Sequence, residues 1–102
     1  MTRIIVLFNL KSDADPAEYE QWARNMDLPQ VRRLPGVRSF DIFRTAGLLT
    51  GEPKAPYQFV EIIEVDDFDA FTGSLGGAQV QALAAQFNTF ADNPVFMVAD
   101  HL

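Results

Sequence analysis

The sequence contains no cysteine, and its one histidine, His101, lies next to the last residue. Without cysteine the chain has no disulfides, thiolate nucleophiles, iron–sulfur clusters or thiolate zinc sites. A single histidine also argues against zinc sites and catalytic triads, because zinc needs three or four ligands and a serine nucleophile needs a positioned base. We therefore predict no metal. His101 stays a candidate ligand-binding residue, with a simple strand-end position as the alternative.

Long apolar runs, phosphate-binding motifs and an excess of positive charge are also missing. No stretch approaches the roughly 20 apolar residues of a membrane span. The first ten residues do not match an export signal, so we expect a cytoplasmic protein. No G-x-G-x-x-G or G-x-x-x-x-G-K-S/T motif occurs, and we predict no cofactor. The net charge of −6 opposes binding to nucleic-acid phosphates.

What the sequence does have is enough apolar material for one packed core. Of its 102 residues, 48% are hydrophobic and nine are Phe. This length fits a single domain, which we assign to residues 1–102. Apolar and β-branched runs predict four strands: Ile4–Leu10, Val37–Leu48, Tyr57–Val65 and Val95–Asp100.

Two helical segments are predicted between these strands. The first opens with Asp15 as N-cap and Pro16 at the first helical position. Tyr19, Trp22, Ala23 and Met26 form its apolar stripe, and it should end or kink near Asp27, ahead of Pro29, before a short turn through Val31 and Leu34. The second opens at Asp66–Asp67 and is interrupted at Gly76–Gly77. The order βαββαβ predicts an α+β, ferredoxin-like sandwich: a four-stranded antiparallel sheet with both helices on one face.

The sheet face without helices should be polar if the chain is a monomer. The strand 57–65 is instead mainly apolar on both sides, with Phe59 and Ile63 on one face and Val60 and Ile62 on the other. Such an exposed face would form a larger apolar patch than monomers usually carry. We therefore predict a homodimer through the open face of the sheet. A monomer with a less polar second face is the alternative.

The segment from Trp22 to Val37, WARNMDLPQVRRLPGV, resembles the end of the first helix in dimeric α/β-barrel proteins, which carry H-x-P-x-V-x-x-L-P-G-V or a close variant. Asp27 stands where the ethyl-ether-degradation (EthD) branch has histidine. This departure, with YQFVE at 57–61 and FADNP at 90–94, resembles the REDY-like HapK family, associated with prodigiosin-type and other secondary-metabolite pathways. The resemblance implies a homodimeric barrel with one pocket per subunit between the first helix and the sheet. For some relatives it also implies cofactor-free chemistry, such as dehydration of carboxylate-bearing intermediates.

Two carboxylates are the candidate catalytic residues. Glu61 lies between Phe59 and Ile63 on one strand face, where desolvation would raise its pKa and prepare a general acid or base. The alternative is a partly exposed residue or one paired with an arginine. Asp27 occupies the position of the histidine in the resembling branch, at the expected pocket mouth. An ion pair with Arg24 or Arg32 is its alternative role.

Six further residues are candidate substrate-binding groups, each with a structural alternative. Asn9 ends the first strand and either binds a ligand carbonyl or caps the turn. Tyr19 and Trp22 carry polar tips that need partners, so they either face a pocket or complete the core. Tyr57 shares a strand face with Glu61. Arg38 and Arg44 either bind a substrate carboxylate or form surface ion pairs.

Three functions follow from these residues. The first is a protein that binds an aromatic or polyketide-like metabolite and acts as a cofactor-independent enzyme of secondary metabolism, using general acid–base catalysis, for example as a carboxylate dehydratase. The second is a non-catalytic ligand-binding or accessory protein of a biosynthetic pathway. The third is a cofactor-free monooxygenase. Fold resemblance alone does not decide among them.

Overall fold

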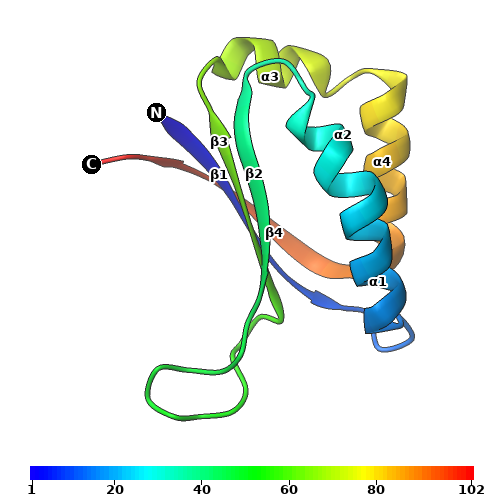
Figure 1. The fold of residues 1–102 in the computed structure, drawn as a ribbon, viewed down its shortest axis with the longest axis vertical. Coiled ribbons are helices and arrows are strands. Elements are labelled where there is room, and N and C mark those ends of the chain that lie inside the picture. Colours follow the sequence, from blue (N-terminus) through cyan, green and yellow to red (C-terminus); the bar gives the residue numbers. More distant parts are fainter.

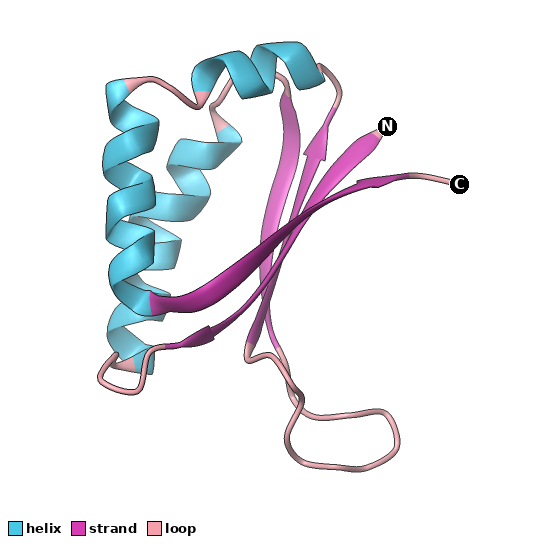
Figure 2. Cartoon of the chain, turned by 180° about the vertical axis from the view of Figure 1, so that it is seen from behind, coloured by secondary structure: helices cyan, strands magenta, loops and turns pink.

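A four-stranded antiparallel sheet and one layer of helices form the structure, a computed structural model that describes residues 1–102 (Figure 1). The strands lie in the order β2-β3-β1-β4, and all helices cover one face of the sheet (Figure 2). The strands are β1 (Thr2–Leu10), β2 (Val37–Arg44), β3 (Phe59–Val65) and β4 (Ala91–Asp100). The predicted ferredoxin-like βαββαβ sandwich is confirmed.

The first helical segment is irregular up to Asp27, where an end or a kink was predicted, and it then continues as a helix to Arg32. It runs through α1 (Pro16–Trp22), the π-helix η1 (Ala23–Asp27) and α2 (Leu28–Arg32). Asp15 caps its start as predicted, its side chain accepting from the Ala17 amide at 2.9 Å. The predicted short turn through Val31 is wrong, since the chain stays helical to Arg32.

Pro29 is the physical reason for this π turn. Proline has no N–H to donate to the carbonyl four residues earlier, and its ring needs room there. The turn widens accordingly, and the Leu28 amide donates to the Ala23 carbonyl, five residues back. A π turn holds more residues than an α-helical turn, so the residues that follow it lie at a smaller angle around the helix axis than in a regular α-helix. It therefore decides which side chains face the sheet.

The second helical segment follows the prediction closely. Asp67 caps α3 (Phe68–Ser74), its side chain accepting from the Ala70 amide at 3.0 Å. The chain breaks at Gly76–Gly77 and resumes as α4 (Ala78–Phe90). That helix passes directly into β4, four residues earlier than predicted. Pro94 and the positive-φ residue Asn93 lie where the register of β4 against β1 shifts, a bulge that tolerates the missing N–H.

The core fills the space between the helices and the sheet. Strand alternation sends Val6 and Phe8 of β1 toward the helices, beside Phe59 of β3. The Phe8 ring lies within 5.6 Å, centroid to centroid, of the rings of Tyr19, Phe59 and Phe87. Aromatic pairs at such distances add to the stabilisation from burial. Of these rings, Phe87 also lines the cavity between the helices and the sheet.

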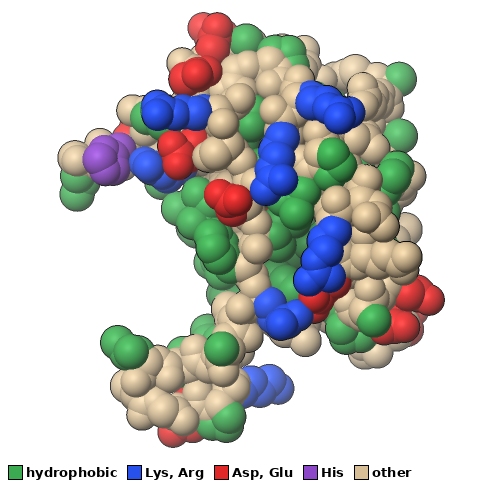
Figure 3. All heavy atoms as spheres, in the orientation of Figure 1, with side chains coloured by type: hydrophobic (Ala, Val, Ile, Leu, Met, Phe, Trp, Pro, Cys, Tyr) green, Lys and Arg blue, Asp and Glu red, His purple; other side chains and the backbone are tan.

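The opposite sheet face is open and apolar. Its exposed or half-buried residues are Ile5, Leu7, Phe43, Val60, Ile62, Val95 and Met97. Hydrophobic side chains line the concave side of the molecule, between the projecting loop and the chain termini (Figure 3). That loop, residues 45–58, extends away from the body and carries the fully exposed Leu49. None of the helices has the length and apolarity needed to cross a bilayer.

Candidate functional site

An apolar cavity of about 450 Å³ lies between the helices and the sheet. Its floor comes from β1, β2 and β3, and most of its walls come from α3 and α4. Phe96 and Val98 of the edge strand β4 line it too, and both are more than 60% exposed. They therefore mark its opening. Of the 19 lining residues, 16 are hydrophobic, and the others are Asp27, Glu61 and Thr72.

Asp27 and Glu61 bring two buried carboxyl groups to this cavity. Each is only 5% exposed. Glu61 faces the helices because it alternates with the outward-facing Val60 and Ile62 along β3, and it pairs with Val6 across the sheet. The two predicted catalytic residues, 34 positions apart in the sequence, thus line one cavity.

The π turn places Asp27 there. Tyr19, Ala23, Asp27 and Val31, each four residues from the next, are all buried. In an uninterrupted α-helix this spacing would drift by about 40° per step. The wide turn at Ala23–Asp27 offsets the drift and keeps the residues on the inner face. Met26, predicted in the apolar stripe, is 39% exposed as a result.

Tyr19 lies behind Glu61 in the core. It is fully buried, and its hydroxyl donates to Glu61 Oε2 at 3.5 Å, a long hydrogen bond. Burial and the neighbouring acidic groups raise the pKa of Tyr19 far above its usual range. The phenol therefore stays protonated and orients one oxygen of Glu61.

Burial raises the pKa of both carboxyl groups into the neutral range. For Asp27 the pKa rises to about 7 through desolvation. For Glu61 it rises to about 8, first through desolvation and then through the charge of Asp27, while the Tyr19 hydrogen bond lowers it slightly. The charge of Asp27 thus disfavours ionisation of Glu61, as a like charge does. At a pH between the two pKa values Asp27 is mostly ionised and Glu61 mostly protonated, which gives an acceptor and a donor.

Asp27 lines the cavity with a carboxyl group that has no partner within the chain. Asp27 makes no side-chain hydrogen bond within the chain, and only Oε2 of Glu61 is bonded, to Tyr19. No buried side-chain polar atom that is sealed from solvent lacks a partner. Thr72 offers less, because its hydroxyl already bonds the Phe68 and Asp69 carbonyls. The carboxyl pair is thus the polar feature that a ligand would meet.

Trp22 does not line this cavity. Its indole N–H donates to Gln86 Oε1 at 2.7 Å, and its ring packs beside Tyr19 and Phe90. These contacts join the first helical segment to α4. Trp22 and Tyr19 thus occupy the core side of the site, not its wall.

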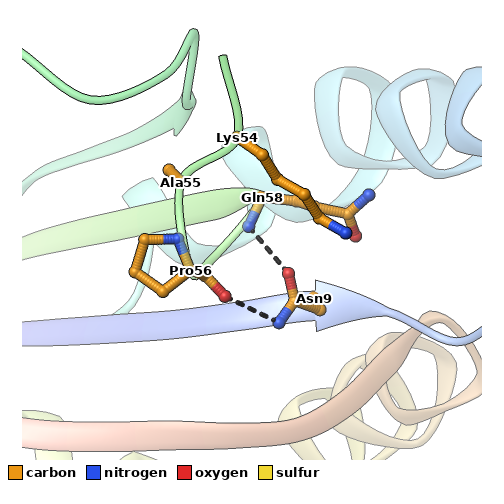
Figure 4. Close-up of a pocket in the computed structure, with 5 residues that line it drawn as sticks. All are labelled: Asn9, Lys54, Ala55, Pro56 and Gln58. Atoms are coloured by element: carbon orange, nitrogen blue, oxygen red, sulfur yellow. Dashed lines mark hydrogen bonds between the residues drawn. The ribbon is translucent and has the colours of Figure 1, made fainter. Parts of the chain in front are cut away.

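Asn9 lies at the base of the projecting loop instead of in the cavity (Figure 4). Its amide donates to the Pro56 carbonyl at 3.1 Å, and its Oδ1 accepts from the Gln58 amide at 3.0 Å. Together with Lys54 and Ala55 these residues border a separate, open hollow. Asn9 therefore anchors the loop.

Tyr57 belongs to that loop, because β3 begins two residues later than predicted. It lies outside the cavity, and its carbonyl accepts from Thr45 Oγ1 at 2.7 Å.

The remaining candidates also lie outside the cavity. Arg44 pairs with Glu20, with Nη1 2.6 Å from Oε1. Arg38 is exposed and forms no ion pair. His101 follows the end of β4, and its backbone amide donates to the Met1 carbonyl at 3.2 Å. No three His, Cys, Asp or Glu side chains gather as a metal site would require.

Sequence reasoning missed the part of the cavity wall formed by the second helical segment. Phe68, Phe71, Leu75, Leu83 and Phe87 line the cavity, whereas the pocket was expected between the first helix and the sheet. The helical spacing of these residues was visible in the sequence. It predicted a buried face, and nothing in it distinguished a packed face from a cavity wall.

Several known proteins are similar to this chain. The family described as "REDY-like protein HapK" matches residues 2–102. HapK from Hahella chejuensis is 27% identical, with a TM-score of 0.79 over 100% of this chain and 93% of that one. A dimeric ferredoxin-like protein of unknown function from Thermobifida fusca is 20% identical, with a TM-score of 0.74 over 98% and 90%.

A third similar structure is a mutant form of SnoaB, a cofactor-independent oxygenase from Streptomyces nogalater. It is 20% identical, with a TM-score of 0.75 over 98% of this chain and 91% of that one. At this identity the likeness shows a shared fold. None of the curated proteins matches. The family match covers nearly every residue and agrees with the fold and with the resemblance at Trp22–Val37, so the chain belongs to the REDY-like HapK family.

Proposed function

We propose that this protein binds a small aromatic or polyketide-like metabolite in the cavity and catalyses a cofactor-independent acid–base reaction on it. The observation that carries the proposal is the Asp27–Glu61 pair, whose free oxygens face an apolar cavity of about 450 Å³. Ligand sites typically measure roughly 300 to 1,000 Å³ and combine apolar walls with a few polar groups. Buried carboxyls with strongly raised pKa values cluster at catalytic sites.

One ionised and one protonated carboxyl group give the pair both halves of acid–base catalysis. The ionised carboxylate accepts a proton from a C–H next to a substrate carbonyl, and the protonated partner donates to a leaving hydroxyl. The C–H and C–O bonds break, a C=C bond forms, and water leaves. One proton enters the pair and one leaves it, so no cofactor is consumed. Dehydration of this kind uses groups whose pKa lies near the working pH.

We further propose that the protein works as a homodimer through the open sheet face, in the cytoplasm, as a single domain of 102 residues. The apolar residues of that face support this, because an exposed patch of this kind is unusual for a monomer. The similar Thermobifida fusca protein is described as dimeric. Binding and catalysis do not require the second copy in this proposal.

The test uses the purified protein with an aromatic β-hydroxy ketone, and enone formation is followed by absorbance and mass. We expect Glu61→Gln and Asp27→Asn each to lower kcat at least a hundredfold while binding persists, in line with the usual contribution of acid–base groups. Glu64→Gln, on the same strand but the opposite face, is the matched control and should leave kcat unchanged.

Unchanged turnover and binding in Glu61→Gln would remove Glu61 as the acid or base. Binding without turnover, across a panel of such ketones, would favour the accessory ligand-binding protein. Oxygen uptake with an electron-rich phenol would favour a cofactor-free monooxygenase, the class that the description of SnoaB suggests.

A further inference from the structure

The cavity carries negative charge and no positive charge. Its charged lining residues are Asp27 and Glu61, and no Lys, Arg or His side chain lines it. Thr72 has its hydroxyl bonded to its own helix. That hydroxyl can only accept from a ligand, and the charged groups that a ligand meets are the two carboxyl groups. An ionised carboxylate only accepts hydrogen bonds, and a protonated one adds a single donor.

Three arginines of the first helical segment and of β2 are engaged in contacts outside the cavity. Arg44 and Arg24 both pair with Glu20, at 2.6 Å and 3.3 Å. Arg32 donates to the Phe40 carbonyl at 3.0 Å, and its Nη2 lies 3.5 Å from Asp41 Oδ1. None of these arginines is thus left to reach the cavity as a counter-ion for a ligand carboxylate or phosphate.

We infer that the part of the ligand buried in the cavity is an apolar ring system that carries, beside the reacting C–H and hydroxyl, a protonated nitrogen or an N–H donor directed at Asp27 and Glu61. The inference rests on the proposed function and deepens it, because it names the chemical class that the same site takes. A ligand carboxylate, where one is present, lies at the opening near Phe96 and Val98, in contact with water.

Charge desolvation is the physical reason. An anion entering the cavity would leave water for an apolar site that offers no cation and already holds a carboxylate. A cation or N–H group instead finds free oxygens and a charge of opposite sign, in a region where weak screening strengthens the attraction. The net charge of the whole chain, −6, acts in the same direction at longer range.

Three naphthalene probes of matched size test the inference by isothermal titration calorimetry at pH 7: 2-naphthylmethylamine, 2-naphthylmethanol and 2-naphthoate. The amine is a cation, the alcohol is neutral and the naphthoate is an anion. We expect the amine to bind at least tenfold more tightly than the naphthoate, with the alcohol between them. Asp27→Asn should reduce the advantage of the amine at least fivefold, since the amide keeps the shape and removes the charge.

Glu64→Gln is the control variant and should leave all three affinities unchanged. Thermal unfolding of each variant shows whether it is folded. If the alcohol binds and the naphthoate binds as tightly as the amine, this inference is overturned while the proposed binding function stands. If no probe binds to the folded wild-type protein, the proposed binding function fails and the inference fails with it. An amine preference that Asp27→Asn leaves intact would also overturn the inference.

Discussion

Glu61 and Glu64 lie three residues apart on β3 and occupy opposite faces of the sheet. Glu61 faces the helices, is 5% exposed and has a pKa raised to about 8 by burial. The side chain of Glu64 faces the open side, is 30% exposed and lies 3.8 Å from the Arg3 guanidinium. Alternation along a strand decides the environment of each side chain. The same residue type is thus a candidate acid–base group on one face and half of a surface ion pair on the other.

The two faces also differ in how their apolar residues are covered. On the helix side, the helices cover the apolar residues, and part of the buried core lines the cavity. On the open side, Phe43 is 50% exposed and Val95 is 39% exposed, with no helix packed over them. The first face is completed by the chain itself, and the second is where we propose the partner copy. Substitutions on the two faces should therefore affect different measurements.

The largest effect is expected for Phe8→Ala. Phe8 is fully buried against three aromatic rings, so its loss should lower the free energy of unfolding by about 3 to 5 kcal/mol. Phe43→Ala, on the open face, should lower it by about 1 kcal/mol or less when the monomer is measured. Urea unfolding at low protein concentration tests both. Equal losses would contradict the division of the sheet into a packed face and an open one.

The next effect is a pH dependence of stability. Folded Glu61 keeps its proton to about pH 8, whereas its ordinary pKa is 4.5, and Asp27 behaves similarly between 3.8 and about 7. The folded state therefore binds more protons in this window, and the free energy of unfolding falls as the pH rises through it. Glu61→Gln should reduce the drop between pH 5 and pH 9 by roughly 2 to 4 kcal/mol. Glu64→Gln should leave it unchanged in urea titrations, and an equal reduction in both variants would refute the buried-carboxyl assignment.

A smaller effect is expected from a charge on the open face. Ile62→Lys places an ammonium group in the centre of this face, between Ile5 and Asp41. It should weaken self-association at least tenfold, or about 1.4 kcal/mol, with the fold preserved. Asn88→Lys, on an exposed position of α4, is the control. Light scattering after size exclusion compares the two variants with the wild-type protein. A wild-type protein that is monomeric at micromolar concentration would remove the dimer proposal.

The smallest effect is expected for Arg44→Ala. Its pair with Glu20 is short, but the Arg44 side chain is 66% exposed, and exposed ion pairs contribute about 1 kcal/mol or less. Stability and binding of the naphthalene probes should both stay near the wild-type values. A large loss of binding would assign Arg44 to the ligand site after all.

The fold was predictable because its signals are local and repeated. Asp15–Pro16 and Asp67 mark helix starts, and alternation in Phe59–Val65 marks a strand. Each of these patterns acts over a few residues, so it can be recognised without knowledge of the rest of the chain. Strand ends were less predictable, because the loop 45–58 takes residues from both neighbouring strands. At the base of this loop, hydrogen bonds from the side chains of Asn9 and Thr45 to backbone carbonyls take the place of the backbone hydrogen bonds between strands.

The site was predictable only in part. Glu61 could be recognised as a carboxylate among apolar strand residues. Because side chains alternate along a strand, its side chain was expected on the opposite face from Val60 and Ile62. Asp27 was found by resemblance, because regular helical geometry does not place it inside. Asn9, Trp22 and Arg44 each found a partner far along the chain, at Pro56, Gln86 and Glu20. Such pairings depend on tertiary structure, which local patterns do not contain.

The π turn at Ala23–Asp27 absorbs one residue more than a regular helix would need to join Tyr19 to Val31. At about 100° per residue, eleven residues of α-helix complete about three full turns, whereas twelve go roughly a quarter to a third of a turn further. A chain that lacks an exposed residue of this turn, such as Asn25, and has another residue in place of Pro29 could therefore wind regularly and still present Asp27 to the cavity. Related sequences can thus differ in length by one position at this turn and keep the same acidic group in place. An alignment that allows no gap there would set the wrong residue opposite the aspartate.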